Sequence, residues 1–235
     1  MFYEYYILGI ILLPGILLAI YAQTKVHATF DKFSEIGCEY DKPAHEIARM
    51  FLDSAGLHDI QVVKVRGHLT DYYNHRKKII ALSENVYDSK SIAAIGIACH
   101  EVGHAIQYKS DYLPIKIRNV IIPVCNVANN FLWALMLLGA LFFYTNLGMA
   151  FLWVGAGVFA LSVLLNLVTL PVEYNASKRA TQLLGQSTVF NEREVEYTKK
   201  VLDSAALTYV AGLVVSILNL LRLLLLIFSN SSRRD

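Results

Sequence analysis

The residues best suited to chemistry in this 235-residue chain lie in one short motif. His100 and His104 are four positions apart, and Glu101 directly follows the first histidine. Residues four apart share one face of a helix, so both imidazoles can reach a single tetrahedral zinc ion. Glu101 lies to one side of that face and can accept a proton from the attacking water as general base. The H-E-x-x-H spacing therefore predicts a catalytic zinc site with one zinc ion per chain.

Two histidines leave a catalytic zinc site one protein ligand short. The metzincin continuation is missing, since Gln107 and Ser110 stand where that pattern has glycine and histidine. Glu173 is the best candidate, because the two apolar segments before it would lead the chain across the membrane and back to the same face. Two alternatives stay open: a water molecule completes the site, or another residue does, such as His68 or Asp71. In both, Glu173 is an ordinary carboxylate near a helix end.

A zinc peptidase also needs a donor for the negative oxygen that develops during peptide cleavage. Sequence alone does not choose among five candidates, each of which is more often structural than catalytic. They are His68, Tyr72, Tyr73, His75 and Arg179.

The composition of the chain indicates a membrane protein. Hydrophobic residues make up 55% and charged residues 17%, and the mean hydropathy is +0.44. Soluble domains are roughly 45–50% apolar and about 25% charged. The apolar excess excludes intrinsic disorder, and the formal net charge of +2 argues against a nucleic-acid partner. Three widely spaced cysteines form no disulfide framework.

The apolar excess lies in four segments, each long enough to cross a bilayer as a helix of about 20 residues. The first could instead be a cleavable signal peptide, but it lacks a basic start and Ile20 breaks the cleavage pattern, which favours a retained anchor. Two polar segments remain, 23–119 and 171–204. The predicted transmembrane helices are 1–22, 120–144, 147–170 and 205–228.

With four crossings, both polar segments lie on one side of the membrane and both termini on the other. Of the 21 Lys and Arg residues, 13 fall within 25–118 and 5 within 178–200. The positive-inside rule makes the shared side cytoplasmic, so both termini should be extracytoplasmic.

Residues 23–119 contain patterns of both helices and strands. A helix is expected from Pro43 to about Gly56, and a second from Ser89 or Ser91 to about Tyr108. Residues 60–65 alternate as a strand. Residues 78–82 are a shorter strand, either an edge strand that holds an extended peptide or a plain core strand. The predicted fold is α+β and mostly helical, with four transmembrane helices and a small cytosolic zincin-like part.

Three motifs give the chain a family resemblance. They are His-Leu-Thr-Asp at 68–71, His-Glu-Val-Gly-His-Ala-Ile-Gln at 100–107 and Leu-Pro-Val-Glu-Tyr-Asn-Ala-Ser at 170–177. Together with the N-terminal apolar segment, they resemble the YugP-like membrane neutral zinc metallopeptidases over essentially the whole chain. The chain is more distantly similar to the HtpX-type and CAAX-prenyl gluzincin endopeptidases.

The resemblance implies zinc ligands His100, His104 and Glu173, with Glu101 as general base. In those relatives an Asp commonly follows the ligand Glu by four positions and orients a zinc-bound His. Here Ser177 stands at that position, and a hydroxyl is a weaker acceptor.

The expected function is a multi-pass zinc endopeptidase of a bacterial plasma membrane. It should cleave peptide bonds of membrane or membrane-proximal proteins at the cytoplasmic face, and its oligomeric state is left open. A non-catalytic zinc-binding scaffold or adaptor is the alternative, which the intact Glu101 disfavours. A transporter is disfavoured because the sequence has no internal repeat.

Overall fold

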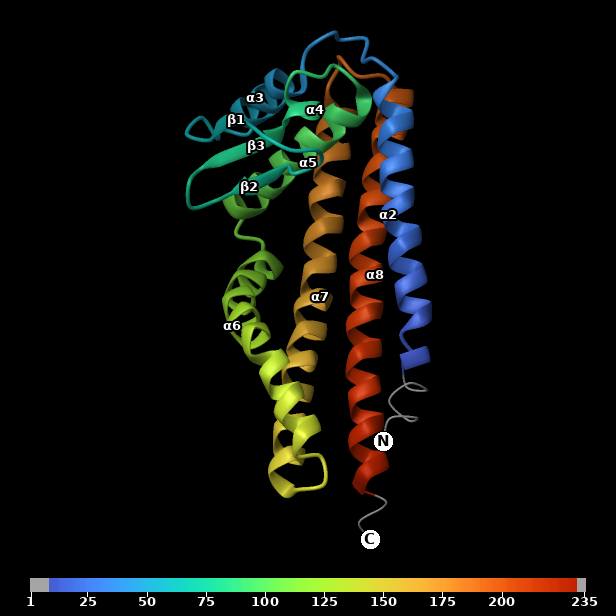
Figure 1. Cartoon of the computed structure of the whole chain (residues 1–235). Coiled ribbons are helices and arrows are strands. Elements are labelled where there is room, and N and C mark those ends of the chain that lie inside the picture. Colours follow the sequence, from blue (N-terminus) through green and yellow to red (C-terminus); the bar gives the residue numbers. More distant parts are fainter. Residues whose placement is uncertain (1–8, 232–235) are drawn as a thin grey trace. The chain divides into compact units, whose positions relative to one another are not determined.

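The computed structural model describes residues 9–231, which are mostly helical with one small sheet (Figure 1). The chain divides into two compact units. We call Met1–Ala22, Lys116–Leu170 and Thr208–Asp235 the apolar unit, and Gln23–Ile115 and Pro171–Leu207 the α+β unit.

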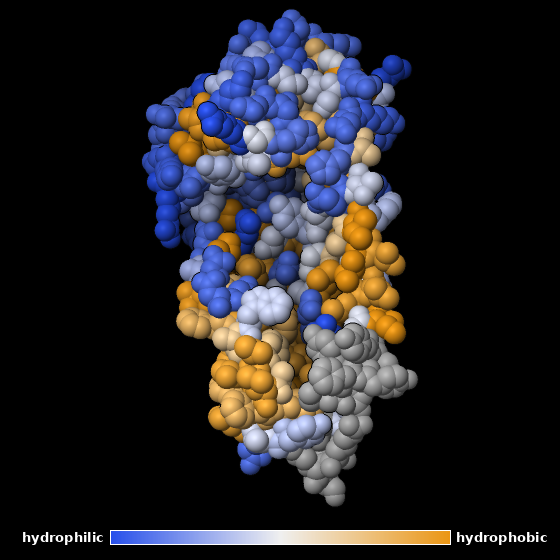
Figure 2. Space-filling model, in the orientation of Figure 1, coloured by the Kyte–Doolittle hydropathy of each residue, from blue (hydrophilic) through white to orange (hydrophobic). Residues whose placement is uncertain are grey.

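Three long helices supply most of the apolar unit: α6 (Leu113–Leu141), α7 (Asn146–Gln186) and α8 (Glu192–Ser231). Each is long and apolar enough to cross a membrane. Large side chains on α6 such as Val120 and Trp133 are exposed, and Figure 2 shows hydrophobic surface in orange around the lower part of α6. Apolar patches of this extent suit a lipid environment rather than water.

The first predicted span, residues 1–22, falls partly outside the described residues, since 1–8 are not among them. Helix α2 (Leu13–Ser34) passes the predicted boundary at Ala22 without a break. Its later residues Phe30 and Phe33 are buried in the core of the α+β unit. Within residues 9–231, three helices and not four have the length and apolar character of a membrane span.

The α+β unit contains the predicted helices and strands, with one additional strand and one additional short helix. The helices are α3 (Ala44–Ser54), the short α4 (Glu84–Tyr87) and α5 (Ile92–Lys109). The strands are β1 (Gln61–Val65), β2 (Tyr72–Asn74) and β3 (Ile79–Ser83), in the order β1-β3-β2. Strand β3 pairs parallel with β1 and antiparallel with β2.

Strand β3 is therefore the central strand, which decides between the two interpretations of residues 78–82. Ile80, Ala81 and Leu82 are fully buried, as expected for a strand paired on both sides and covered by helices. The alternative of an edge strand that receives a peptide is wrong for this segment. The three-residue β2 is an edge strand instead.

Helix α5, which carries the H-E-x-x-H motif, lies in the middle of the core. Helix α3 packs against it with a buried face that includes Ile47 and Leu52. The same core includes Ala180 and Leu184 of α7 and residues of α8. Because apolar neighbours surround α5 on several sides, its side chains have little freedom to move.

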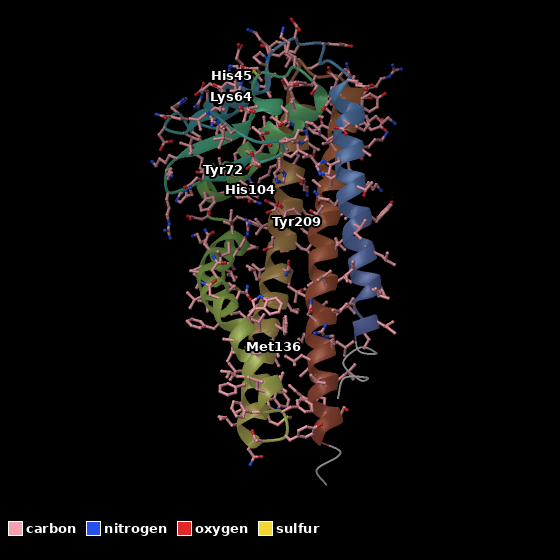
Figure 3. All side chains as sticks on the ribbon, in the orientation of Figure 1. His45, Lys64, Tyr72, His104, Met136 and Tyr209 are labelled. Carbon is pink, nitrogen blue, oxygen red and sulfur yellow. The ribbon has the colours of Figure 1, made fainter. Side chains whose placement is uncertain are left out.

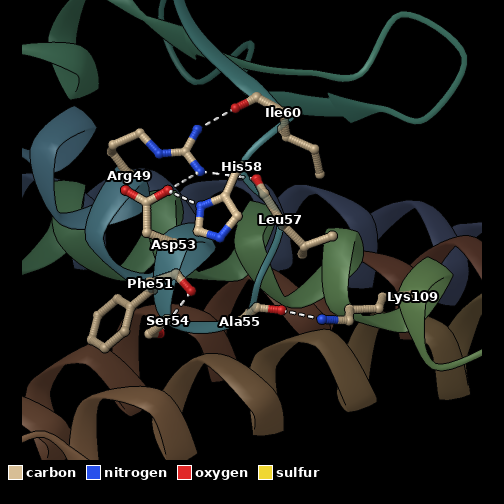
Figure 4. Close-up of polar contacts among 9 residues, drawn as sticks. All are labelled: Arg49, Phe51, Asp53, Ser54, Ala55, Leu57, His58, Ile60 and Lys109. Atoms are coloured by element: carbon tan, nitrogen blue, oxygen red, sulfur yellow. Dashed lines mark hydrogen bonds and ion pairs between the residues drawn. The ribbon is translucent and has the colours of Figure 1, made fainter.

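Polar contacts tie the end of α3 to β1 and to the end of α5 (Figure 4). The Arg49 guanidinium donates to the carbonyl oxygens of Leu57, at 2.9 Å, and Ile60. Lys109, the last residue of α5, donates to the carbonyl oxygen of Ala55. These contacts satisfy carbonyl groups in the turn after α3 and connect that turn to the C-terminal end of α5.

Candidate metal centre

Helix α5 begins with a side-chain cap and carries the motif in its second half. The Ser91 hydroxyl accepts a hydrogen bond from the Ala94 amide at 3.2 Å, which satisfies one of the free N–H groups of the first turn. His104 lies on this helix (Figure 3), one turn after His100. Glu101 is buried, with 7% of its surface exposed.

Gly103 brings α5 into direct contact with the backbone of α7. A Cβ atom placed on Gly103 would lie 2.5 Å from the carbonyl oxygen of Ala176, far inside any normal contact distance. Only glycine therefore allows the two helices to approach so closely. The side chains that flank Gly103 on α5 can then meet those that flank Ala176 on α7.

Glu173 of α7 lies against both histidines of the motif. Its Oε2 atom is 3.3 Å from Nε2 of His100 and 3.5 Å from Nε2 of His104, and the carboxylate is almost fully buried. Ligand atoms about 2.0–2.1 Å from a tetrahedral zinc ion are about 3.3 Å apart. The donor types and their spacing thus fit one zinc ion, and their role as ligands remains a prediction.

The two other proposed third ligands have different surroundings. The Asp71 carboxylate accepts hydrogen bonds from the Ser83 amide at 2.7 Å and from the Ser83 hydroxyl. Burial raises the pKa of Asp71, although these hydrogen bonds oppose the rise. The His68 ring lies near the rings of Phe30 and His27. Within residues 9–231, His100, His104 and Glu173 form the one group of such side chains spaced to share a metal ion.

The Nδ1 atom of each histidine has a partner of its own, which leaves each Nε2 directed toward Glu173. Nδ1 of His100 lies 3.1 Å from the Ser177 hydroxyl, so the residue in place of the relatives' Asp does contact this ring. Nδ1 of His104 lies 2.9 Å from Oε1 of Gln107. This role of Gln107 was not predicted from the sequence, although its spacing of three from His104 could have indicated a shared helix face.

Burial and neighbouring charges shift the pKa values of Glu101 and His104. Burial raises the pKa of Glu101, while the neighbouring imidazoles of His104 and His100 oppose the rise. Burial alone would lower the pKa of His104, but Glu173 and Glu101 outweigh it and raise that pKa. A carboxylate with a raised pKa is suited to accept and release a proton near neutral pH.

Three candidates for the oxyanion donor lie on or next to strand β2. Tyr72 is exposed on this strand (Figure 3). The Tyr73 hydroxyl lies 3.4 Å from Nδ1 of His75, and the His75 ring stacks on Tyr108 with ring centres 4.1 Å apart. Burial raises the pKa of Tyr73 to about 12. Tyr73 therefore keeps its proton at neutral pH and can act as a hydrogen-bond donor.

The fifth candidate, Arg179, is engaged in a polar network on α7. Its Nε atom donates to Oδ1 of Asn175 at 2.8 Å, and its Nη2 donates to the Ser110 hydroxyl at 3.2 Å. Two of its donors thus hold protein groups, which favours a structural role for Arg179 over the oxyanion role.

Comparisons with known proteins agree with a zinc site in this chain. Residues 8–228 match the family described as "Putative neutral zinc metallopeptidase". The chain is 41% identical over 211 residues to the "Putative membrane protease YugP" of Bacillus subtilis (strain 168), which covers 89% of this chain and 91% of that protein. No solved structure matches the chain. The chain belongs to the family of neutral zinc metallopeptidases that this description names.

Proposed function

We propose that the protein is a membrane-embedded zinc endopeptidase of the gluzincin type. The observation that carries the proposal is the position of Glu173, whose carboxylate lies within 3.5 Å of both motif histidines. His100, His104 and Glu173 would hold the metal, which is the donor set of two histidines and one glutamate found at catalytic zinc sites.

Glu101 has the part of general base and then general acid. Bound zinc lowers the pKa of a coordinated water molecule and polarises the carbonyl group of the peptide bond. Glu101 accepts a proton from the attacking water as the new C–O bond forms. It then donates that proton to the nitrogen of the leaving amine as the C–N bond breaks, so the carboxylate is regenerated.

We further propose four membrane spans, with both termini outside the cytoplasm and the zinc site on the cytoplasmic side. The crowding of Lys and Arg in 25–118 and 178–200 supports this orientation. Glu173 follows the predicted span 147–170 by three residues on one continuous helix, α7. A site this near to a span favours membrane or membrane-proximal proteins as substrates.

Metal analysis and cleavage assays on the purified full chain test the proposal. We expect about one zinc per chain and cleavage of casein or of a membrane protein in the same micelle. A chelator should abolish cleavage, and added zinc should restore it. A protein that binds zinc and cleaves no protein substrate would support the scaffold alternative, and a protein that binds no zinc would contradict both functions.

A further inference from the structure

We infer that Gln107 is a positioning residue that fixes which nitrogen of His104 carries hydrogen. The inference rests on the proposed function, because it concerns how His104 is prepared to bind zinc. Gln107 is fully buried and connects His104 on α5 with Val172 and Asn175 on α7. The direction of each hydrogen bond in this network follows from the one before it.

The network begins at Arg179, whose guanidinium group can only donate hydrogen bonds. Its Nε atom lies 2.8 Å from the side-chain amide of Asn175. The amide atom that faces a donor must be the oxygen, because the NH₂ group of an amide does not accept hydrogen bonds. Arg179 thus determines that Asn175 presents its Oδ1 atom to this side.

Two acceptors then meet one end of the Gln107 amide. Oδ1 of Asn175 lies 3.1 Å from Nε2 of Gln107, and the carbonyl oxygen of Val172 lies 2.7 Å from the same atom. An amide oxygen in this place would face two other oxygens, whereas NH₂ can donate one hydrogen to each. The Gln107 amide therefore has one favourable orientation, with its two donors toward α7.

The other end of that amide faces the zinc-binding histidine. Oε1 of Gln107 lies 2.9 Å from Nδ1 of His104, and an amide oxygen only accepts hydrogen bonds. The hydrogen of the neutral imidazole must therefore be on Nδ1. Nε2 keeps its lone pair and lies on the side of Glu173, which is the form that a metal ligand needs.

His100 differs in this respect, which provides an internal comparison. Its Nδ1 atom faces the Ser177 hydroxyl, and a hydroxyl can both donate and accept. The Ser177 contact does not by itself select one form of His100. The fixed network thus serves His104 alone, and it also ties the orientation of His104 to α7, the helix that carries Glu173.

The test measures zinc affinity and the protonated nitrogen of His104 in the full chain in detergent. Gln107→Leu removes the acceptor and should weaken zinc binding by about 10- to 100-fold in chelator competition. Asn175→Asp keeps an oxygen toward both Arg179 and Gln107, so it should retain wild-type affinity, whereas Asn175→Leu should weaken binding. Gln182→Leu, the same change at an exposed position of α7, is the control and should retain wild-type affinity.

Nitrogen NMR of histidine-labelled, zinc-free protein supplies the second measurement. We expect the hydrogen of neutral His104 on Nδ1 in wild type and in Asn175→Asp, and a shift toward Nε2 in Gln107→Leu. Hydrogen on Nε2 and not on Nδ1 of His104 in wild type, or wild-type zinc affinity in a folded Gln107→Leu variant, would overturn the inference. If Gln107→Leu does not fold, the wild-type spectrum and the two Asn175 variants decide. A wild-type protein without zinc affinity would refute the proposed function, and its spectrum would still test Gln107.

Discussion

The carbonyl oxygen of Ala176 occupies the space where any residue other than glycine at position 103 would have its Cβ atom. A Cβ atom on Gly103 would approach that oxygen to 2.5 Å and the Ala176 carbonyl carbon to 3.1 Å. These are backbone atoms, so they cannot turn aside as a flexible side chain would. The distance between α5 and α7 depends on position 103 having a hydrogen atom and not a methyl group on its Cα. The spacing of the candidate zinc ligands depends on that distance.

Gly103→Ala should therefore force the two helices apart and weaken zinc binding. Overpacking of this kind costs about 1–3 kcal/mol of stability, more than the gain of about 0.5–1 kcal/mol from replacing glycine within a helix. We expect a lower melting temperature and a lower zinc content. Gly185→Ala on α7 meets one atom at 4.0 Å and should be neutral or stabilising. Equal zinc content in both variants would contradict the role of the close contact.

Glu101→Gln should retain zinc and lose peptidase activity. The amide has nearly the same shape as the carboxylate but cannot accept and return a proton, so a loss of at least about 10²–10⁴-fold in turnover is expected. Zinc content and cleavage rate are measured on the same preparation. Glu196→Gln, at an exposed carboxylate paired with Lys200, should keep both. Cleavage at the wild-type rate by Glu101→Gln would exclude Glu101 as the base.

Ser177→Ala should weaken zinc binding less than Gln107→Leu does. Loss of one neutral hydrogen bond to His100 corresponds to about 1 kcal/mol, or roughly fivefold in affinity. Ser177→Asp should instead strengthen zinc binding above wild type, because a carboxylate accepts a stronger, charge-assisted hydrogen bond from the ring. Chelator competition measures the zinc affinity of wild type, Ser177→Ala and Ser177→Asp and ranks them. Unchanged affinity in both Ser177 variants would show that this hydroxyl does not orient His100.

The orientation in the membrane is tested by reporters fused after Asp235. Because most Lys and Arg residues lie in the two polar segments, we expect a periplasmic alkaline phosphatase fusion to be active and a cytoplasmic fluorescent fusion to be dark. The same reporters inserted after Gly56, in the turn that follows α3, should give the opposite result. A cytoplasmic signal after Asp235 would reverse the proposed topology or change the number of spans.

The elements of the α+β unit that repeat a clear pattern could be predicted from sequence. The apolar face of α3 recurs at helical spacing, and β1 alternates, so both agree with the expected ranges to within one or two residues. Strand β2 spans only Tyr72–Asn74, which is too short for an alternating pattern. The position of β3 between two strands depends on pairing partners, which hydropathy does not encode.

The predicted boundary between the span 147–170 and the polar segment 171–204 was placed where hydropathy changes. The backbone hydrogen bonds of a helix do not have to stop at such a point. Helix α7 continues through Pro171 to Gln186, because a proline removes one donor without requiring the helix to end. At the site, the spacing of the motif was enough to predict that His100 and His104 lie on one face of a helix. The spacing of Gln107 from His104 could have indicated their contact on α5, but the acceptors of Gln107 on α7 could not be predicted, since they are 65 and 68 residues away.

The position of Glu173 is the feature on which the proposed chemistry depends most directly. It lies 73 residues from His100 in sequence, yet its carboxylate is 3.3 Å from that ring. Glu173→Ala should fold and insert, because Ala suits a helix, but it should purify with little zinc and no activity. A carboxylate that only interacts with a helix end contributes about 0.3–1 kcal/mol, and its removal would leave the zinc content unchanged.

Glu196→Ala provides the matched control for this experiment. It removes a carboxylate from α8 of the same α+β unit, where Glu196 lies 2.6 Å from Lys200 and is exposed. We expect wild-type zinc content and activity in this control, because a surface ion pair contributes about 0–1 kcal/mol. Full zinc occupancy in Glu173→Ala, or a zinc-bound structure with this carboxylate well beyond about 2.2 Å from the metal, would remove Glu173 from the site. Loss of zinc in Glu173→Ala alone would assign the third ligand to α7, and the contact between Gly103 and Ala176 would then have a direct function in metal binding.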